Sequence, residues 1–291
     1  MTASPAAVVV NHDAGEALLE CVASLRRDGV GDIVVVDNAS ADGSPERLEV
    51  ADPSARMIRA GRNLGYGAAV NRGVAALDAA LVLVSNPDVV AHPGAVQSLA
   101  DALVADPATA VAGPRIVSPE GARYPSARRF PSWVDAAGHA LLGAVSEDNP
   151  FTRRYRMTDL DPDATSAVDW VSGAFFLVRR DAFEELGGFD ERYFMYLEDV
   201  DLCWRMHQVG YRVAYVPSAT VTHIQGHSTG RRPYRMLVEH HRSALRFAAR
   251  RSAGWRRVAL PGVAVLLAVR LLVAVFRQAV TPPNKGARPA D

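Results

Sequence analysis

The sequence predicts an α/β fold with a Rossmann-like, mostly parallel central sheet flanked by helices. Short, almost wholly apolar runs alternate with segments in which apolar residues recur at helical spacing, a pattern typical of parallel β-α-β units. The apolar runs show little polar alternation, which indicates a sheet covered on both faces. The chain is predicted to end in a basic and apolar helical extension.

The first 105 residues predict four strands that alternate with helices. Ser44 followed by Pro45 is typical of a helix N-cap and first turn. The strands are predicted at 6–10, 33–36, 57–58 and 81–84, and the helices around 18–25, from Ser44, over 67–80 and over 94–105.

Residues 117–168 differ from the rest, because prolines, arginines and scattered aromatics occur there with weak periodicity. Two interpretations of this region remain open: an insertion of loops and short helices that covers a functional site, or a plain surface loop. Regular patterns return after Trp170, with strands predicted at 174–178 and 213–216, a helix at 181–186 closed by Gly187–Gly188, and a helix at 198–209 ended by Gly210.

Charge is unevenly distributed along a chain with no net charge. Residues 1–230 carry a net charge of −11 and residues 231–291 a net charge of +11. The acidic body would repel phosphate, so no nucleic-acid partner is expected, whereas the basic end suits an anionic membrane surface. Cys21 and Cys203 are too few for a disulfide scaffold, and no signal peptide is predicted at the N-terminus.

Polar residues follow three of the predicted strands directly. Asn11, Asp37–Asn38 and Asn86–Asp88 each come after an apolar run. In open α/β sheets, ligands bind outside the carboxyl ends of the strands. Asp37 and Asp88 are therefore candidates to hold a nucleotide and a divalent cation, since Mg²⁺ and Mn²⁺ take oxygen ligands and bridge diphosphates.

A short glycine-containing loop, Arg62–Gly67, opens the third helix and could bring backbone N–H groups and Arg62 close to a phosphate. It is neither a Walker loop nor a dinucleotide fingerprint, which disfavours an ATPase and a dehydrogenase.

Three carboxylates, Glu198, Asp199 and Asp201, lie in the first turn of a predicted helix. The helix dipole favours anions there and is expected to hold an acid ionised at neutral pH, as a general base requires; helix capping is the alternative. Arg205 is predicted to pair with Asp201, four residues earlier.

The segment His223–Ser228 follows a strand-like run. Its first histidine is a candidate metal ligand, while His227 or Ser228 could contact phosphate, and a structural role is the alternative. Both cysteines are predicted to be core thiols.

In their order along the chain, these segments resemble the inverting family 2 glycosyltransferases of the GT-A fold, and within them the bacterial rhamnosyltransferase branch. The resemblance covers roughly residues 6–230. The segments that carry it are Val8–Asn11, Val36–Ser40, Asn63–Asn71, Ser85–Val89, Gly173–Arg179, Gly188–Glu191, Glu198–Leu202 and the His223–Gly226–Ser228 pattern.

The resemblance implies a role for each matching residue. Asp37 would read the nucleotide base, Asp88 would be the last acid of a metal-binding DxD motif whose first acid is replaced by Asn86, and Asp199 would be the general base beside Glu198. His223 would reach the metal or the diphosphate. The nucleotide-sugar site would comprise Val10, Asn11, Asp37, Asn38, Arg62, Asn63, Gly65 and Asn86, and the acceptor side Trp170, Gly173 and Ala174.

The resemblance also implies an activity: metal-dependent transfer, with inversion, of L-rhamnose from dTDP-rhamnose to a polyprenyl-diphosphate-linked N-acetylglucosamine in cell-wall or cell-surface polysaccharide synthesis. The cofactor would be Mg²⁺ or Mn²⁺, and the location the cytoplasmic face of the plasma membrane. A galactosyl, mannosyl or N-acetylglucosaminyl transferase, a sugar-1-phosphate nucleotidyltransferase and a non-catalytic sugar-nucleotide-binding scaffold remain alternatives. The sequence is compatible with a homodimer.

The same reading predicts a catalytic domain at 1–230 and a basic helical tail at 231–291. Within the domain, 1–116 would bind the nucleotide sugar, 117–169 would be a variable acceptor-side insertion, and 170–230 would form the acceptor and catalytic half.

The tail contains a candidate membrane segment at 258–280. Its 13 Val, Leu and Phe residues contribute roughly −5 kcal/mol to membrane insertion, whereas Arg270 costs about 2.5–3.5 kcal/mol. Arg256, Arg270 and Arg277 share one helical face, so a helix lying in the membrane interface is as compatible as a span. A soluble helical hairpin is the third alternative.

Overall fold

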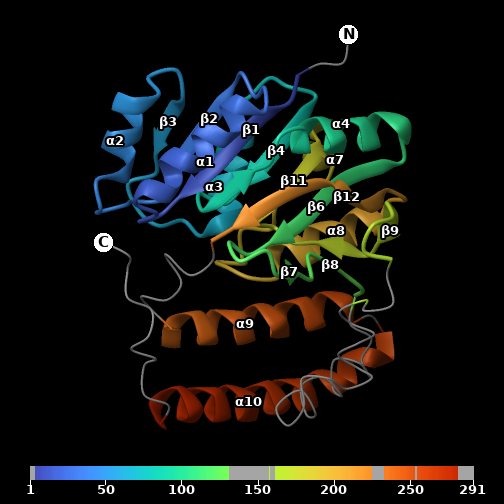
Figure 1. Ribbon diagram of the computed structural model, residues 1–291. Coiled ribbons are helices and arrows are strands. Elements are labelled where there is room, and N and C mark those ends of the chain that lie inside the picture. The colour runs from blue at the N-terminus through green and yellow to red at the C-terminus, as the bar shows by residue number, and fades with distance from the viewer. Residues whose placement is uncertain (1–3, 131–156, 158–160, 225–232, 253, 281–291) are drawn as a thin grey trace. The chain divides into compact units, whose positions relative to one another are not determined.

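The computed structural model describes residues 4–130, 157, 161–224, 233–252 and 254–280 (Figure 1). The chain divides into two compact units, Met1–Arg231 and Arg232–Asp291. The first unit contains the sheet and its helices, and the second contains the C-terminal helices.

A ten-stranded sheet forms the centre of the first unit, with β3-β2-β1-β4-β11-β6-β12-β5 as its main strand order. The first four of these strands are parallel, because β1 pairs with β2 and β4, and β2 pairs with β3. They confirm the predicted strands and lie at Ala6–Asn11 (β1), Ile33–Asp37 (β2), Arg56–Arg59 (β3) and Leu81–Ser85 (β4).

The second half of the sheet is mixed. β11 (Phe175–Arg179) runs antiparallel to both β4 and β6 (Thr109–Val117). β12 (Arg212–His223) runs parallel to β6 and antiparallel to β5 (Val89–Ala91). The predicted fold class, a mostly parallel central sheet flanked by helices, is therefore confirmed. The strands β11, β5 and the small strands add antiparallel pairings that the sequence does not predict.

The sequence pattern does not predict β6, because Gly113 and Pro114 lie inside it and both residues usually interrupt strands. The structure accommodates Pro114 at an irregularity. It lies opposite Val216, immediately before the register between β6 and β12 shifts. Such shifts leave a backbone group outside the regular ladder, so the missing proline N–H costs little there.

Helices cover both faces of the sheet, which explains why its strands lack polar alternation (Figure 1). Ala7 and Val9 pack into the core that contains Leu18 of α1. On the opposite face, Gly73 of α3 lies so close to Val8 that a Cβ atom there would come within 2.4 Å of its Cγ1. The described residues of this unit form the helices α1 (Glu16–Arg27), α2 (Ser44–Ala51), α3 (Tyr66–Val74), α4 (Ala95–Ala105), α7 (Arg180–Glu185) and α8 (Glu198–Gln208).

Two predicted helix boundaries are wrong. Ser44 is the first residue of α2 and not its cap; Gly43, with φ of +75°, precedes it, and the Ser44 hydroxyl donates to Asp42 Oδ1 at 2.7 Å. The helix predicted over 67–80 ends at Val74, because the next backbone bonds join residues three apart, as from Leu77 N to Val74 O. Turn hydrogen bonds thus replace the helical ones.

The region predicted as an insertion is only partly described, since 131–156 and 158–160 lie outside the described residues. The described part, together with the two residues that follow it, contains short strands that the sequence does not predict. β7 pairs with β6, β9 with β12, and β8 with β10. Their bounds are Arg123–Tyr124 (β7), Ala127–Arg128 (β8), Ser166–Val168 (β9) and Trp170–Val171 (β10).

In the second unit, the described residues form α9 (Pro233–Arg251), the 3-10 helix η2 (Gly254–Ala259) and α10 (Leu260–Val280). Helices α9 and α10 contact each other (Figure 1). By length and composition, Arg257–Ala279 is apolar enough to cross a membrane, and none of its most apolar window is buried. Several of its large side chains are exposed, namely Val258, Val265, Val269, Leu272, Val273 and Phe276.

Candidate active site

The carboxyl ends of β1, β2 and β4 meet at one edge of the sheet. Asn11 lies opposite Asp37 in the β1–β2 register, and Val9 lies opposite Ser85, the last residue of β4. Because β11 is antiparallel to β4, its first residue also lies opposite Ser85. The segment preceding β11 therefore joins the same edge, and Asn86 N donates to Ala174 O at 2.8 Å.

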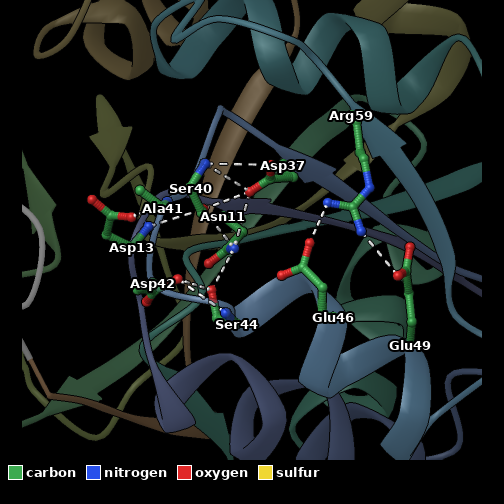
Figure 2. Close-up of polar contacts among 10 residues, drawn as sticks. All are labelled: Asn11, Asp13, Asp37, Ser40, Ala41, Asp42, Ser44, Glu46, Glu49 and Arg59. Atoms are coloured by element: carbon green, nitrogen blue, oxygen red, sulfur yellow. Dashed lines mark hydrogen bonds and ion pairs between the residues drawn. The ribbon is translucent and has the colours of Figure 1, made fainter.

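Figure 2 shows a buried polar network at the ends of β1 and β2. Asn11 Nδ2 lies 3.2 Å from Asp37 Oδ1, 3.0 Å from Ser40 Oγ and 3.0 Å from Ser44 Oγ. Asp37 also accepts the Ser40 hydroxyl at 2.5 Å. Asn11 is fully buried and Asp37 almost so.

The surrounding partners determine the orientation of the Asn11 amide. Ser40 and Ser44 donate their own protons to Asp37 and Asp42, so their oxygens can only accept from Asn11. An ionised Asp37 accepts only. The nitrogen must therefore face these three oxygens, and Oδ1 of Asn11 is buried without a hydrogen-bond partner among the described residues.

Two acids at the surface join the loops that follow β1 and β2 (Figure 2). Ala41 N donates to Asp13 Oδ1 at 2.7 Å, and Gly15 N donates to Asp42 Oδ2 at 2.8 Å. Beside them, Arg59 of β3 pairs with Glu46 and Glu49 of α2 in exposed ion pairs. The loops near Asp37 are thus held by hydrogen bonds between segments distant in sequence.

Asn38 fixes the glycine-containing loop before α3. Its Nδ2 donates to Gly65 O at 3.1 Å and its Oδ1 accepts Leu64 N at 3.1 Å, while Asn63 Oδ1 accepts Gly65 N at 3.0 Å. Gly65 has φ of +90°, and a Cβ atom there would come within 2.4 Å of Phe194 O. Only glycine fits at this position.

Asp88 and His223 lie together near the end of β4. His223 Nε2 is 3.1 Å from Asp88 Oδ1, and Asn86 Nδ2 is 3.5 Å from the same nitrogen. His223 Nδ1 is buried without a hydrogen-bond partner among the described residues. Among all the residues that the structure describes, no group of three or more His, Cys, Asp or Glu is placed to hold a metal ion. One carboxylate and one imidazole fit a cation that takes its remaining ligands from diphosphate and water.

Glu198 and Asp199 begin α8. Tyr196 and Leu197, just before them, have φ of +68° and +63°, conformations that such residues rarely adopt and that concentrate at functional sites. Asp199 Oδ2 accepts Gly173 N at 2.8 Å, and its Oδ1 accepts Val200 N at 2.8 Å. Glu198 Oε2 is buried and has no partner in the described structure.

The expectation of an acid held ionised at this helix N-terminus does not apply to Glu198. Burial, and then the adjacent charge of Asp199, raise the pKa of Glu198 to about 8, so its carboxyl group is protonated at neutral pH. Burial also raises the pKa of Asp199, against which the N–H groups of Gly173 and Val200 act. Asp199, whose carboxylate accepts these two N–H groups, is the better placed of the pair to carry a negative charge.

The remaining predicted residues occupy different environments. Trp170 is buried, with its ring N–H donating to Arg129 O at 3.1 Å and the Arg128 guanidinium 5.2 Å from its ring centre. Val10 is buried in β1, whereas Arg62 is exposed. His227 and Ser228 lie outside the described residues.

Two predictions about helix α8 and the thiols are confirmed. Asp201 is fully buried and forms an ion pair with Arg205, with 2.7 Å between Oδ2 and Nε. Arg205 also donates to the carbonyls of Leu186 and Gly188. Cys21 and Cys203 are buried, and burial raises the pKa of both thiols to about 12.

Sequence reasoning assigns no role to Tyr66 or Ser40, although both lie within the segments that carry the resemblance. Tyr66 Oη donates to Gly173 O at 2.6 Å, and Ser40 joins Asn11 to Asp37. For Tyr66, its position between Gly65 and Gly67 is the only signal that the sequence offers.

The carboxyl-terminal edge of the sheet, where these side chains gather, is the place at which open α/β folds bind their ligands. Residues 6–187 match the model of "Glycosyl transferase family 2", and the chain belongs to this family of glycosyltransferases.

The chain is 43% identical over 266 residues to the N-acetylglucosaminyl-diphospho-decaprenol L-rhamnosyltransferase of Mycobacterium tuberculosis (strain CDC 1551 / Oshkosh), covering 87% of this chain and 86% of that protein.

Two solved structures are similar in fold. GalNAc-T7 with UDP, GalNAc and Mn²⁺ has a TM-score of 0.59 at 16% identity; the similarity covers 77% of this chain and 43% of that one. The mannosyltransferase PcManGT of Pyrobaculum calidifontis, with GDP-Man and Mn²⁺, has a TM-score of 0.54 at 18% identity, covering 97% of this chain and 77% of that one. These similarities confirm the predicted GT-A fold.

Proposed function

We propose that this glycosyltransferase transfers L-rhamnose from dTDP-rhamnose to the N-acetylglucosamine of a polyprenyl-diphosphate-linked acceptor, with inversion and with a divalent cation. The observation that carries the proposal is the 43% identity, over 87% of the chain, to a relative named for this sugar and this type of acceptor. Because the similarity covers 87% of the chain, it is not confined to one half of the catalytic unit.

The donor would bind across the ends of β1, β2 and β4. Asp37, held by Asn11 and Ser40, would face the base, and the loop held by Asn38 would lie against the diphosphate. Asp88 and His223 would hold Mg²⁺ or Mn²⁺, and both solved relatives contain Mn²⁺. When bound, such a cation neutralises the charge that develops on the departing nucleoside diphosphate.

Asp199 would take the proton from the acceptor hydroxyl. As that oxygen attacks the anomeric carbon, the bond to the diphosphate breaks on the opposite face, so a single displacement inverts the configuration. The N–H groups of Gly173 and Val200 hold the carboxylate in one orientation. Protonated Glu198, beside it, adds no second negative charge at neutral pH. No covalent enzyme intermediate is required.

The composition of the second unit is compatible with an acceptor that is anchored in a membrane. The exposed apolar side chains of α10 and the arginines of α9 suit the cytoplasmic face of an anionic plasma membrane, on which the chain would be peripheral or anchored through α10.

A donor panel tests the proposal. dTDP-rhamnose, UDP-galactose, UDP-N-acetylglucosamine and GDP-mannose would each be incubated with a prenyl-diphosphate N-acetylglucosamine, with product configuration read by NMR. Preference for dTDP-rhamnose with inversion supports the proposal, and preference for another donor contradicts the sugar assignment. A nucleotidyltransferase would release inorganic diphosphate instead, and a scaffold would release neither product.

A further inference from the structure

One hydrogen bond joins the donor-side loop to the segment that holds the general base. Tyr66, the first residue of α3, donates its hydroxyl proton to Gly173 O at 2.6 Å across 107 residues of sequence. Tyr66 is buried, and burial together with the nearby charges of Glu198 and Asp199 raises its pKa well above 10. The hydroxyl therefore stays protonated and remains a donor throughout the working pH range.

Gly173 contacts Asp199 through its other backbone group. Its N–H donates to Asp199 Oδ2 at 2.8 Å, and a Cβ atom on Gly173 would come within 3.1 Å of Asp199 Cβ and 3.2 Å of Oδ2. The next carbonyl, of Ala174, accepts Asn86 N at 2.8 Å. Gly173 therefore lies between the base and Tyr66, and a small shift of its backbone would move the donor that orients Asp199.

The other end of this connection is rigid. Tyr66 N donates to Phe194 O at 3.0 Å, and Gly65 lies against the same carbonyl. Asn38 holds Leu64 and Gly65 from the end of β2. The Tyr66 ring also packs edge-on against Phe189, with centroids 6.3 Å apart. Tyr66 is thus held through its backbone, its ring and its hydroxyl. A shift of the donor loop would therefore also shift Tyr66 and the carbonyl of Gly173 that it contacts.

We infer that Tyr66 is a positioning residue for catalysis, which orients the general base Asp199 through the backbone of Gly173 and so links it to the donor-binding loop. This rests on the proposed function, in which Asp199 takes the acceptor proton. The charged and titratable neighbours of Asp199 include Glu198 and Cys203 of α8, Arg128 of β8 and Tyr66 itself.

Tyr66→Phe tests the inference because it removes one oxygen and keeps the ring. Transfer would be measured on the full chain with dTDP-rhamnose and Mg²⁺ or Mn²⁺ and a short-chain prenyl-diphosphate N-acetylglucosamine. We expect kcat to fall about 5- to 10-fold, the effect of one hydrogen bond, while the donor KM stays within about twofold. With a weaker N–H donor, Asp199 holds its proton to higher pH, so the acid limb of the kcat profile should move upward.

Tyr211→Phe is the matched control, since the Tyr211 hydroxyl contacts Glu185 in an exposed pair away from the sheet edge. It should leave kcat and the pH profile unchanged. A Tyr66→Phe enzyme with wild-type kcat, one that loses donor affinity alone, or one that does not fold would each overturn the inference in favour of a structural or donor-binding role.

A double-mutant cycle separates this inference from the proposed function. If Tyr66 acts through Asp199, adding Tyr66→Phe to Asp199→Asn should leave the residual rate unchanged. A further loss of the same 5- to 10-fold size would contradict the inference while leaving the general base intact. High activity in Asp199→Asn alone would instead contradict the proposed function.

Discussion

His223 Nε2 lies 3.1 Å from Asp88 Oδ1, although 135 residues separate them in sequence. The antiparallel pairing of β12 with β5 produces this contact, because His223 lies opposite Val89, the residue after Asp88. Ile224 N also donates to Asp88 O at 3.0 Å, so backbone and side chain hold the pair together. A carboxylate and an imidazole are thus presented at one point of the sheet edge.

Asp88→Ala should weaken donor binding only when a divalent cation is present. We expect a loss of at least about tenfold, since even partners that merely orient metal ligands contribute roughly 10–100-fold. Calorimetry with the nucleotide sugar, in Mn²⁺ or Mg²⁺ and in EDTA, measures both states. Asp78→Ala, in an exposed ion pair with Arg180, is the control. Equal donor affinity for Asp88→Ala and wild type in Mn²⁺ and Mg²⁺ would refute the metal assignment.

Asp199→Asn should reduce transfer to a small residual rate and leave donor binding nearly intact. The substitution keeps the shape of the side chain and removes the base, whose contribution is typically 10²–10⁴-fold in rate. Steady-state kinetics and donor titration check the two parts separately, with Glu184→Gln at the surface of α7 as the control. Activity within about threefold of wild type would mean that Asp199 only caps α8.

Glu198→Gln should stabilise the folded protein, increasingly so as pH rises from about 5 to 8. The pKa of Glu198 is raised from 4.5 to about 8 in the folded state, so between these values the folded chain binds a proton that the unfolded chain has lost. The free energy of unfolding of the wild type therefore falls across this pH window by an amount on the order of a few kcal/mol, and it is constant above the window. Glutamine has no such dependence.

Melting temperatures of both proteins between pH 5 and 9 measure this difference. It should widen up to about pH 8 and then stay constant. A constant offset across the range would show that Glu198 ionises normally in the folded enzyme.

Asp201→Ala should destabilise the catalytic unit by about 3–5 kcal/mol, because it leaves Arg205 mostly buried without its carboxylate. Urea unfolding followed by fluorescence measures the change. Disrupting the exposed pair of Arg212 with Asp106, by Asp106→Asn, should cost no more than about 1 kcal/mol. Similar losses in the two variants would mean that the buried pair contributes nothing beyond a surface pair.

Deleting residues 255–291 should release most of the protein from membranes. The apolar face of α10 would be lost, whereas 1 M salt, which shortens the Debye length to about 3 Å, should release little of the intact chain. The deletion should reduce activity on a long-chain lipid acceptor far more than on a short-chain soluble analogue. Sedimentation with anionic liposomes checks this, with deletion of 281–291 alone as the control.

A truncated chain that still sediments with liposomes in 1 M salt would place the membrane contact elsewhere, most plainly in the arginine-rich and aromatic stretch at 123–133.

The sequence by itself determined the parallel half of the fold. Apolar runs such as Ile33–Val36 are short and rich in β-branched residues, as strands covered on both faces are, and local sequence patterns indicated the helices between them. The polar residues that follow them, including Asn11 and Asp37, had to meet at one edge because parallel strands end on the same side. Local pattern and strand direction were sufficient for these features.

Only the tertiary structure decided the rest, because it depends on which distant segments pair. The contacts of His223 with Asp88 and of Tyr66 with Gly173 follow from β12 joining β5 and from β11 running antiparallel to β4. The sequence does not predict β6 because it contains Gly113 and Pro114, and the strand is accommodated by a register shift in its pairing with β12. The protonation of Glu198 likewise depends on burial among residues from several elements, because desolvation outweighs the helix dipole that the sequence alone reveals.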